Sequence, residues 1–328
     1  MTMEQGNPAL IVDGLTTSIR VDGHWYETVR DISFSVGPKE TLALVGESGC
    51  GKSLTALSIM DLLPPKVARI TRGRIVVDGV DMTAADLATR QAMRGDRIGM
   101  IFQDPMTSLN PVLPIGFQIG ESLIQHRGLS RKAARAQALR LLDLVRVPAA
   151  SERLDAYPHQ FSGGMRQRVM IALALACQPR VLIADEPTTA LDVTIQAQVL
   201  ALLADLQERE GLAVLLITHN LGVVASVADR VMVMYGGDVV ESGPVGAFFD
   251  IPSHPYSVAL LAAMPRIEGG GDLQPIPGQV PSLPEMPTGC RFQARCPLRM
   301  PRCAELPPFT PVGGNPAHLV RCWARSEA

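Results

Sequence analysis

One short segment carries the clearest chemical signal in the sequence. Residues 46–53 read G-E-S-G-C-G-K-S, which fits the phosphate-binding pattern G-x-x-x-x-G-K-[ST]. The glycines let the backbone curl so that its N–H groups point at phosphate oxygens, and the helix expected to follow adds its positive N-terminal end. Lys52 is suited to bridge β- and γ-phosphates, and the Ser53 hydroxyl is suited to ligate Mg²⁺. The segment predicts binding of ATP or GTP. The predicted contacts are Gly46, Ser48, Gly49, Cys50, Gly51, Lys52, Ser53 and Leu54.

A second segment supplies two acids. Residues 181–186 read V-L-I-A-D-E, an aliphatic strand that ends in a pair of carboxylates. Asp185 is suited to hold the metal through water, and Glu186 is suited to polarise the attacking water as a general base. The alternative is a surface turn or a helix cap, which the nearby phosphate motif makes less favoured. The two segments together predict nucleotide hydrolysis.

The sequence has six cysteines, of which Cys50 and Cys177 stand alone. Cys50 lies at an expected helix N-terminus, a position that can lower a thiol pKa, and we interpret it as a small filler residue. Four others crowd the end of the chain at spacings that lack the close first pair of a structural zinc site. Three alternatives stay open: an iron–sulfur cluster, which is favoured, zinc, or thiols that pack. The four are Cys290, Cys296, Cys303 and Cys322, and the arginines expected to offset a cluster's charge are Arg291, Arg295, Arg299 and Arg302.

Regular elements must position these residues. Aliphatic runs at 41–45, 181–184, 214–218 and 231–234 read as buried strands, and the first three end in polar or glycine residues. Helical periodicity over 192–209 stops at Gly211, and the Asp78-Gly79 pair predicts a hairpin within 74–81. We therefore expect a mainly parallel sheet with an antiparallel flank.

The sequence pattern changes along the chain and divides it into parts. Residues 104–161 lack strand patterns, which predicts a helical subdomain at about 104–165. After Pro265, a glycine run and many prolines indicate a linker or an irregular wrap. The expected division is a nucleotide-binding domain at 1–250 and a small C-terminal domain at 251–328.

Composition excludes some classes of protein. The 328 residues are 47% hydrophobic and 19% charged, which suits a folded chain with a large core. The net charge of -2 offers no cationic field, so nucleic acid is not an expected partner. No apolar run approaches the roughly 18 residues of a membrane span, and the N-terminus lacks the pattern of a secretory signal. A cytosolic chain is expected.

A third motif points to a family. Residues 161–168, F-S-G-G-M-R-Q-R, resemble the signature sequence of ATP-binding cassette (ABC) ATPases. Gln103, the string Ala190-Leu191-Asp192 and His219 match further motifs of this family in their usual order. The resemblance implies an α/β fold, a P-loop NTPase of the ABC type with a helical subdomain, followed here by a small irregular cysteine-rich domain. It also implies ATP as the substrate and Mg²⁺ as the metal.

The resemblance assigns roles residue by residue. Two nucleotide-binding domains meet head to tail, so Ser162, Gly163 and Gly164 of one would cover the ATP held by the other. His219 is similar to the switch histidine that contacts the γ-phosphate, and Gln103 to the residue that touches Mg²⁺ or water. The remaining implied sites are Asp192, a dimer contact or a helix N-cap, and Tyr26, which counting back from Asp31 favours over Trp25 for stacking on adenine. A core or surface role for the aromatic residue is the alternative.

Longer strings narrow the resemblance to the dipeptide and oligopeptide importer branch. They are residues 102–111, 157–160, 254–256 and 289–297. The branch implies an ATP-hydrolysing subunit at the cytoplasmic face of the cell (inner) membrane, with a second ATPase chain, two permease subunits and a solute-binding protein as partners. Other members of the branch import nickel chelates, opines or glutathione, and some hold a [4Fe–4S] cluster in a similar tail.

Two other functional classes compete with import. Non-transport ABC ATPases that act in DNA repair or on ribosomes typically have a second cassette, a long coiled coil or a basic arm, and this sequence shows none. A redox sensor built around the cysteine tail is the other alternative. The sequence favours the importer subunit over both.

Overall fold

A computed structural model describes residues 7–104, 108–188, 192–264 and 276–325. The chain forms two compact units. The first unit comprises residues 1–11, 35–40 and 75–216, and the second comprises residues 12–34, 41–74 and 217–328. Each unit is considered by itself below.

The first unit contains two parallel, fully buried strands that end near each other. Strand β6 (Ile98–Ile101) pairs with β7 (Val181–Asp185) in the register Ile98 to Val181 and Ile101 to Ala184. Helix α8 (Val193–Glu210) follows β7 in the chain and stops at Gly211, which has a φ of 69°. Strand β7 and helix α8 confirm the strand and the helical periodicity that the sequence predicts at 181–184 and 192–209.

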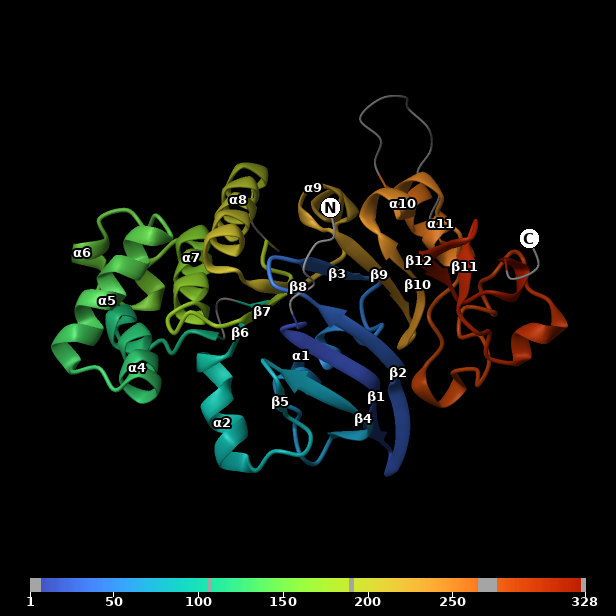
Figure 1. Cartoon of the computed structure of the whole chain (residues 1–328), viewed down its shortest axis with the longest axis horizontal. Coiled ribbons are helices and arrows are strands. Elements are labelled where there is room, and N and C mark those ends of the chain that lie inside the picture. Colours follow the sequence, from blue (N-terminus) through green and yellow to red (C-terminus); the bar gives the residue numbers. More distant parts are fainter. Residues whose placement is uncertain (1–6, 105–107, 189–191, 265–275, 326–328) are drawn as a thin grey trace. The chain divides into compact units, whose positions relative to one another are not determined.

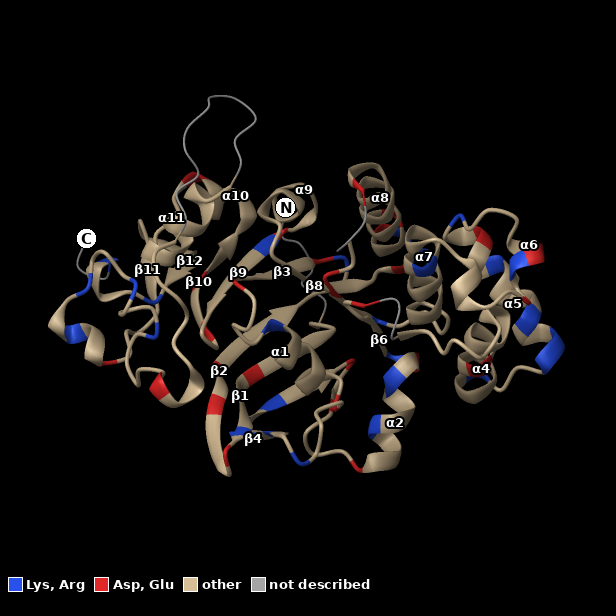
Figure 2. Cartoon of the chain, turned by 180° about the vertical axis from the view of Figure 1, so that it is seen from behind, with Lys and Arg blue, Asp and Glu red and all other residues tan. Residues whose placement is uncertain are grey.

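Helices fill the stretch in which the sequence lacks strand patterns (Figure 1). They are α4 (Ile115–Arg127), α5 (Arg131–Leu144), α6 (Ala150–Arg153), the 3₁₀ turn η1 (Pro158–Gln160) and α7 (Gly163–Ala174). Helix α5 begins at Ser130, whose side chain accepts a hydrogen bond from the Ala133 N–H. Its Ala134, Ala138 and Leu141 are buried at helical spacing, whereas its basic residues are exposed (Figure 2).

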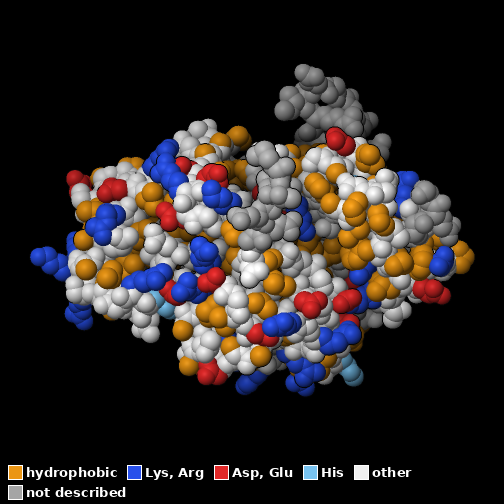
Figure 3. Space-filling view, in the orientation of Figure 1, with side chains coloured by type: hydrophobic (Ala, Val, Ile, Leu, Met, Phe, Trp, Pro, Cys, Tyr) orange, Lys and Arg blue, Asp and Glu red, His pale blue; other side chains and the backbone are white. Residues whose placement is uncertain are grey.

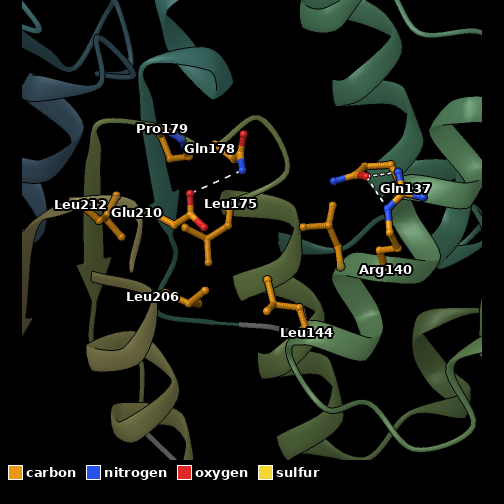
Figure 4. Close-up of a pocket in the computed structure, with 10 residues that line it drawn as sticks. Gln137, Arg140, Leu144, Leu175, Gln178, Pro179, Leu206, Glu210 and Leu212 are labelled. Atoms are coloured by element: carbon orange, nitrogen blue, oxygen red, sulfur yellow. Dashed lines mark hydrogen bonds between the residues drawn. The ribbon is translucent and has the colours of Figure 1, made fainter. Parts of the chain in front are cut away.

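A cavity of about 220 Å³ lies between α5, the end of α7 and α8 (Figure 4). Half of the residues that line it are leucines, and the Gln178 side-chain amide donates to a Glu210 carboxylate oxygen over 3.5 Å. No residue of the predicted nucleotide site lines it. The cavity is therefore separate from that site.

The first unit also contains the predicted hairpin. Strand β4 (Ala68–Val77), whose first part belongs to the second unit, pairs with the short β5 (Val80–Asp81) through Val77 and Val80. Asp78 and Gly79 both have positive φ, 47° and 80°, as the tight turn requires. Helix α2 (Leu87–Asp96) follows, capped by the Asp86 side chain.

The second unit contains the strand that leads into the phosphate motif. Strand β3 (Thr41–Val45) is parallel to β9 (Arg230–Tyr235), which is antiparallel to β10 (Asp238–Pro244). The other long strands are β1 (Leu10–Val21), β2 (His24–Val36) and β8 (Ala213–Thr218), all three shared between the units. The helices of this unit are α1 (Lys52–Ile59), α9 (Leu221–Val227), α10 (Val245–Asp250) and α11 (Pro255–Ala262).

The C-terminal segment differs from the irregular wrap that the sequence predicts. Strands β12 (Asn315–Val320) and β11 (Thr310–Val312) extend the sheet beyond β10, with Glu241 opposite Val320 (Figure 1). Three 3₁₀ turns make up most of the remaining regular structure: η2 (Leu283–Glu285), η3 (Pro301–Ala304) and η4 (Trp323–Arg325). Strand β12 has no clear alternation of polar and apolar residues, so the open edge of β10, not the local sequence, decides its conformation.

An aromatic core joins the C-terminal segment to the sheet of the second unit. Tyr235, Phe248, Tyr256 and Phe292 are each 1% exposed or less and belong to one buried cluster. On the surface, hydrophobic side chains gather over α10 and α11, where Ile251 is 61% exposed (Figure 3). Among the residues described, no helix combines the length and the apolar character that crossing a membrane requires.

Candidate functional site

The phosphate loop, residues 46–53, runs from the end of β3 into α1. Gly46 has a φ of 154°, and a Cβ there would lie 2.1 Å from the Met234 carbonyl oxygen. Gly51, the N-cap of α1, has a φ of 104°, and a Cβ at this position would lie 3.1 Å from a methyl carbon of Val29. Only glycine fits both places, so the loop is built for close approach of backbone to backbone and keeps its N–H groups available to an anion.

Lys52 lies folded within this loop. Its side-chain ammonium donates to the carbonyl oxygens of Gly46 at 2.8 Å and Glu47 at 3.0 Å, and the residue is 6% exposed. A phosphate oxygen can replace these carbonyl oxygens as the acceptor while helix α1, which begins at Lys52, stays in place. Ser53 is half-buried in the first turn of α1. This curl, the helix N-terminus and the lysine fit a triphosphate.

The position of Cys50 at a helix N-terminus does not lower the pKa of its thiol. Burial raises the pKa of its thiol, against the lowering effect of Lys52, because the sulfur is almost fully removed from water. The residue is 1% exposed and fills space behind the loop. Its interpretation as a filler stands, but it is not an activated thiol.

Two predicted catalytic residues are brought together in the first unit. The Gln103 side-chain amide donates to a Glu186 carboxylate oxygen over 3.1 Å, because the two residues follow the parallel strands β6 and β7. Glu186 has a φ of 49°, a conformation that costs a non-glycine residue energy and is concentrated at functional sites. Asp185, at the end of β7, is 3% exposed.

A protein cage is not needed for Mg²⁺ in such a site. Among the described residues, no group of three or more His, Cys, Asp or Glu side chains is arranged to hold a metal ion. Mg²⁺ keeps several waters and binds through one or two protein ligands together with substrate phosphates. The Ser53 hydroxyl, the Asp185 carboxylate and the Gln103 amide oxygen are oxygen donors of the kind that it prefers.

The signature residues lie at an exposed helix N-terminus. Ser162 caps α7, with its hydroxyl oxygen accepting from the Met165 N–H over 3.3 Å. Ser162 and Gly163 are exposed, and a Cβ at Gly163 would meet nothing within 4 Å. Gly164 packs against Ile195 of α8. The first turn of α7 thus presents donors to solvent, as an anion-binding helix end does.

The remaining motif residues begin or precede helices. The Asp192 side chain accepts from the Ile195 N–H over 2.9 Å and caps α8, so the N-cap interpretation is confirmed. Its neighbours Ala190 and Leu191 lie outside the described residues. His219 follows β8 and is exposed, immediately before Asn220, which caps α9. The dimer contact of Asp192 and the phosphate contact of His219 stay predictions.

The two aromatic candidates for adenine differ in their surroundings. Trp25 and Tyr26 are adjacent on β2, so their side chains point to opposite faces of the strand. The Arg69 guanidinium lies 4.1 Å from the centre of the Trp25 ring and occupies one of its faces. Tyr26 is half-buried and keeps the role that spacing favours for it.

The C-terminal segment contacts the phosphate loop through residues that the sequence did not single out for this. Arg295 makes a bidentate ion pair with the Glu47 carboxylate, with N–O distances of 2.6 Å and 3.1 Å. The Tyr256 hydroxyl oxygen accepts from the Glu47 N–H over 2.9 Å. Arg295 and Glu47 lie 248 residues apart in the sequence, and no local sequence pattern predicts that they pair.

The cysteine tail does not support the favoured expectation. In the part of the chain that the structure describes, no group of three or more His, Cys, Asp or Glu side chains is arranged to hold a metal ion, so neither the iron–sulfur cluster nor zinc is supported. Cys303 and Cys322 are buried, and Cys290 and Cys296 pack against the aromatic core. Burial, with smaller contributions from the other three thiols, raises the pKa of Cys290 to about 12. The iron–sulfur cluster therefore stays a prediction.

The arginines near these cysteines have other partners. Arg295 pairs with Glu47, and Arg291 donates to the backbone carbonyls of Gly236 and Glu27. The Arg302 guanidinium stacks 3.6 Å from the centre of the Trp323 ring. These contacts of Arg291, Arg295 and Arg302 tie the tail to the rest of the second unit and to itself.

Known proteins share this organisation. Residues 29–189 match the family described as ABC transporter, and residues 240–303 match the oligopeptide/dipeptide transporter C-terminal region. A solved dimer of the ATP-binding cassette MJ0796, in a post-hydrolysis state bound to ADP and Pi, has a TM-score of 0.65 and 27% identity. It covers 72% of this chain and 98% of its own.

Curated relatives match nearly the whole length. The dipeptide transport ATP-binding protein DppD of Bacillus subtilis is 50% identical over 97% of this chain and 95% of its own. A putative peptide import ATP-binding protein of Brucella abortus is 51% identical over 96% of each chain. Because identity at this level spans both the cassette and the C-terminal region, the chain belongs to the ABC transporter ATPases, among those that carry the oligopeptide/dipeptide transporter C-terminal region.

Proposed function

We propose that this chain is the ATP-hydrolysing subunit of an ABC importer that drives uptake of dipeptides or oligopeptides through separate permease subunits. The observation that carries the proposal is the C-terminal region at 240–303, which this chain shares with dipeptide and oligopeptide transporters. Relatives at about half identity are named for peptide or dipeptide transport. The phosphate loop, the paired acids and the capped signature helix supply the parts of an ATPase.

The chain's own residues divide the work of hydrolysis. The phosphate loop holds the triphosphate, with Lys52 leaving its backbone acceptors for the β- and γ-phosphates. Glu186 takes the proton of the attacking water, and its hydrogen bond from Gln103 fixes the direction of its carboxylate. Ser53, Asp185 and Gln103 would hold Mg²⁺, whose positive charge would offset that of the phosphates. His219 contacts the γ-phosphate.

A second ATPase subunit completes the site. Ser162, Gly163 and Gly164 of that subunit bind the γ-phosphate, and Asp192 contacts the facing chain. The exposure of Ser162 and the open space around Gly163 support this, because a helix end that binds a partner's anion must be accessible. The similar cassette MJ0796 forms a dimer. The partner is a second copy or a homologous chain.

The assembly lies at the cytoplasmic face of the cell (inner) membrane. Two permease subunits contribute the membrane spans, and a solute-binding protein delivers the peptide. ATP binding closes the ATPase dimer and hydrolysis reopens it, and the helical subdomain passes this movement to the permeases.

Reconstitution tests the whole proposal. The complex with its permeases goes into lipid vesicles, and ATP hydrolysis is measured with and without solute-binding protein loaded with a dipeptide. The expected result is stimulation by the loaded protein, and a complex containing Lys52→Ala serves as the inactive control. Stimulation by a nickel chelate, an opine or glutathione but not by peptides would replace the substrate. Hydrolysis that responds to no loaded binding protein would overturn import.

The cysteine tail has its own test. Thiols that pack as the structure shows predict neither iron nor sulfide in protein purified without oxygen. Iron and sulfide in equal amounts, lost in a variant with all four cysteines changed to serine, would reinstate the cluster. Activity measurements do not enter this test.

A further inference from the structure

We propose that Arg295 and Tyr256 are positioning residues for the phosphate loop, and that nucleotide affinity depends on them because they neutralise and hold Glu47. They belong to the C-terminal region and touch the loop directly. Neither residue reaches the reacting atoms. They act on ATP through the loop residue that follows Gly46.

Each of the three guanidinium nitrogens of Arg295 donates at least one hydrogen bond. Its two terminal nitrogens bind the two carboxylate oxygens of Glu47, one at 2.6 Å and the other at 3.1 Å. Its Nε donates to the Pro277 carbonyl over 2.8 Å, and one terminal nitrogen also donates to the Ile276 carbonyl over 3.2 Å. The side chain is 5% exposed, against 29% for Glu47. A bidentate pair set this firmly is among the strong ion pairs.

Tyr256 holds the backbone of the same residue. Its hydroxyl oxygen accepts from the Glu47 N–H over 2.9 Å, and the residue is fully buried. The ring packs edge-on against Tyr235, with centres 4.8 Å apart, and against Phe292 at 5.4 Å. Burial raises the pKa of this hydroxyl, which keeps it neutral. The C-terminal region therefore determines where the first turn of the loop begins.

Charge explains why this matters for ATP. A carboxylate inside an anion-binding loop repels a triphosphate unless a cation cancels it. Hydrogen bonding to Glu47 raises the pKa of Arg295, so the cation is permanent. Glu47 gains a fixed partner, and the loop gains rigidity without a net negative charge. Affinity for ATP thus depends on a residue far from the phosphate motif in sequence.

The test measures ATP binding and hydrolysis in the full chain. Arg295→Ala leaves Glu47 uncompensated, so we expect the Kd and KM for ATP to rise about tenfold while kcat changes much less. Salt should partly restore binding in this variant because it screens the repulsion. Adding Glu47→Gln to Arg295→Ala should restore most of the affinity. A purely structural role for Arg295 predicts neither the salt effect nor the rescue.

Two further variants guard against a folding defect. Arg295→Lys keeps the charge but loses the bidentate geometry, so its Kd should lie between those of wild type and Arg295→Ala. Tyr256→Phe loses only the acceptor for the Glu47 N–H, and we expect Kd to rise about threefold. Thermal unfolding of each variant shows that the protein compared is folded.

The matched control is an equally close pair elsewhere. Arg135 binds both oxygens of Asp155, at 2.6 Å and 2.7 Å, on the exposed surface of the first unit. Arg135→Ala should leave the Kd for ATP unchanged. Wild-type affinity in Arg295→Ala would overturn the proposal, and so would a double variant with Glu47→Gln that binds ATP no better than Arg295→Ala alone.

Discussion

The phosphate loop and the C-terminal segment belong to the same unit but are built in opposite ways. The loop is a contiguous piece of chain in which a strand, glycines and a helix follow one another. The C-terminal segment is stabilised by partners far away in sequence: Arg291 reaches the Glu27 carbonyl across 264 positions, and Arg295 reaches Glu47 across 248. A ligand-binding motif can thus be local while the scaffold that fixes it is not.

The C-terminal segment also depends on one buried carboxylate. Glu241 on β10 is 0% exposed and accepts from the N–H groups of Ser253 and His254, at 2.9 Å and 2.7 Å. His318 on β12 lies 2.8 Å from one of the same oxygens. The carboxylate therefore joins three stretches of chain, whereas the phosphate motif is itself one contiguous stretch. The predictions below separate the two kinds of construction.

The largest effect is expected from a change that removes chemistry and leaves both regions folded. Glu186→Gln keeps the size of the side chain but cannot accept the water proton, so we expect kcat to fall about 1,000-fold. ATP binding should persist, and the dimer should stay closed with ATP bound. Equilibrium binding and steady-state hydrolysis check this. Turnover at the normal rate would assign the base to another residue.

The next largest effect is expected from a substitution that removes contacts between segments far apart in sequence. Glu241→Ala leaves two buried N–H groups and His318 without their acceptor, so we expect the free energy of unfolding to fall by about 3 kcal/mol. Chemical denaturation measures the loss. Glu208→Ala, which breaks an exposed pair with Lys39, is the control and should change little. Equal effects of the two substitutions would contradict the importance of the buried carboxylate.

A smaller effect is expected from a substitution within the phosphate loop itself. Gly46→Ala places a methyl group 2.1 Å from the Met234 carbonyl oxygen, so the loop must shift. We expect a loss of about 2 kcal/mol in stability and weaker ATP binding. Gly246→Ala in α10, where nothing lies within 4 Å of the new methyl group, should be neutral or slightly stabilising. An unchanged Kd for ATP in Gly46→Ala would mean that the loop tolerates the shift.

The smallest effect near neutral pH concerns the protonation of His254. Burial lowers the pKa of His254 from 6.5 to about 3, so the folded protein excludes a proton that the unfolded chain binds. Stability should therefore fall as pH drops below 6.5, by at most about 1.4 kcal/mol per pH unit from this residue. His254→Asn keeps a helix cap for α11 and should flatten the decline. Replacing the exposed His24 by asparagine is the control, and an equal flattening there would contradict the assignment.

Local patterns predicted many of the parts correctly. The strands at 181–185 and 213–218, the helix that stops at Gly211 and the Asp78-Gly79 hairpin follow from periodicity and turn chemistry. The caps at Ser162 and Asp192 follow from residue type. The C-terminal strands β11 and β12 were missed, because β12 becomes a strand by pairing with β10.

The amino-acid order by itself determined the phosphate loop, the paired acids and the capped signature helix, because each depends on the backbone preferences of neighbouring residues. Only the tertiary structure decided that Arg295 pairs with Glu47, that Arg69 covers Trp25 and that Cys50 is buried beyond activation. Those outcomes depend on burial and on the distances in space between segments that are far apart in the chain. The spacing of residues along the sequence does not predict such distances.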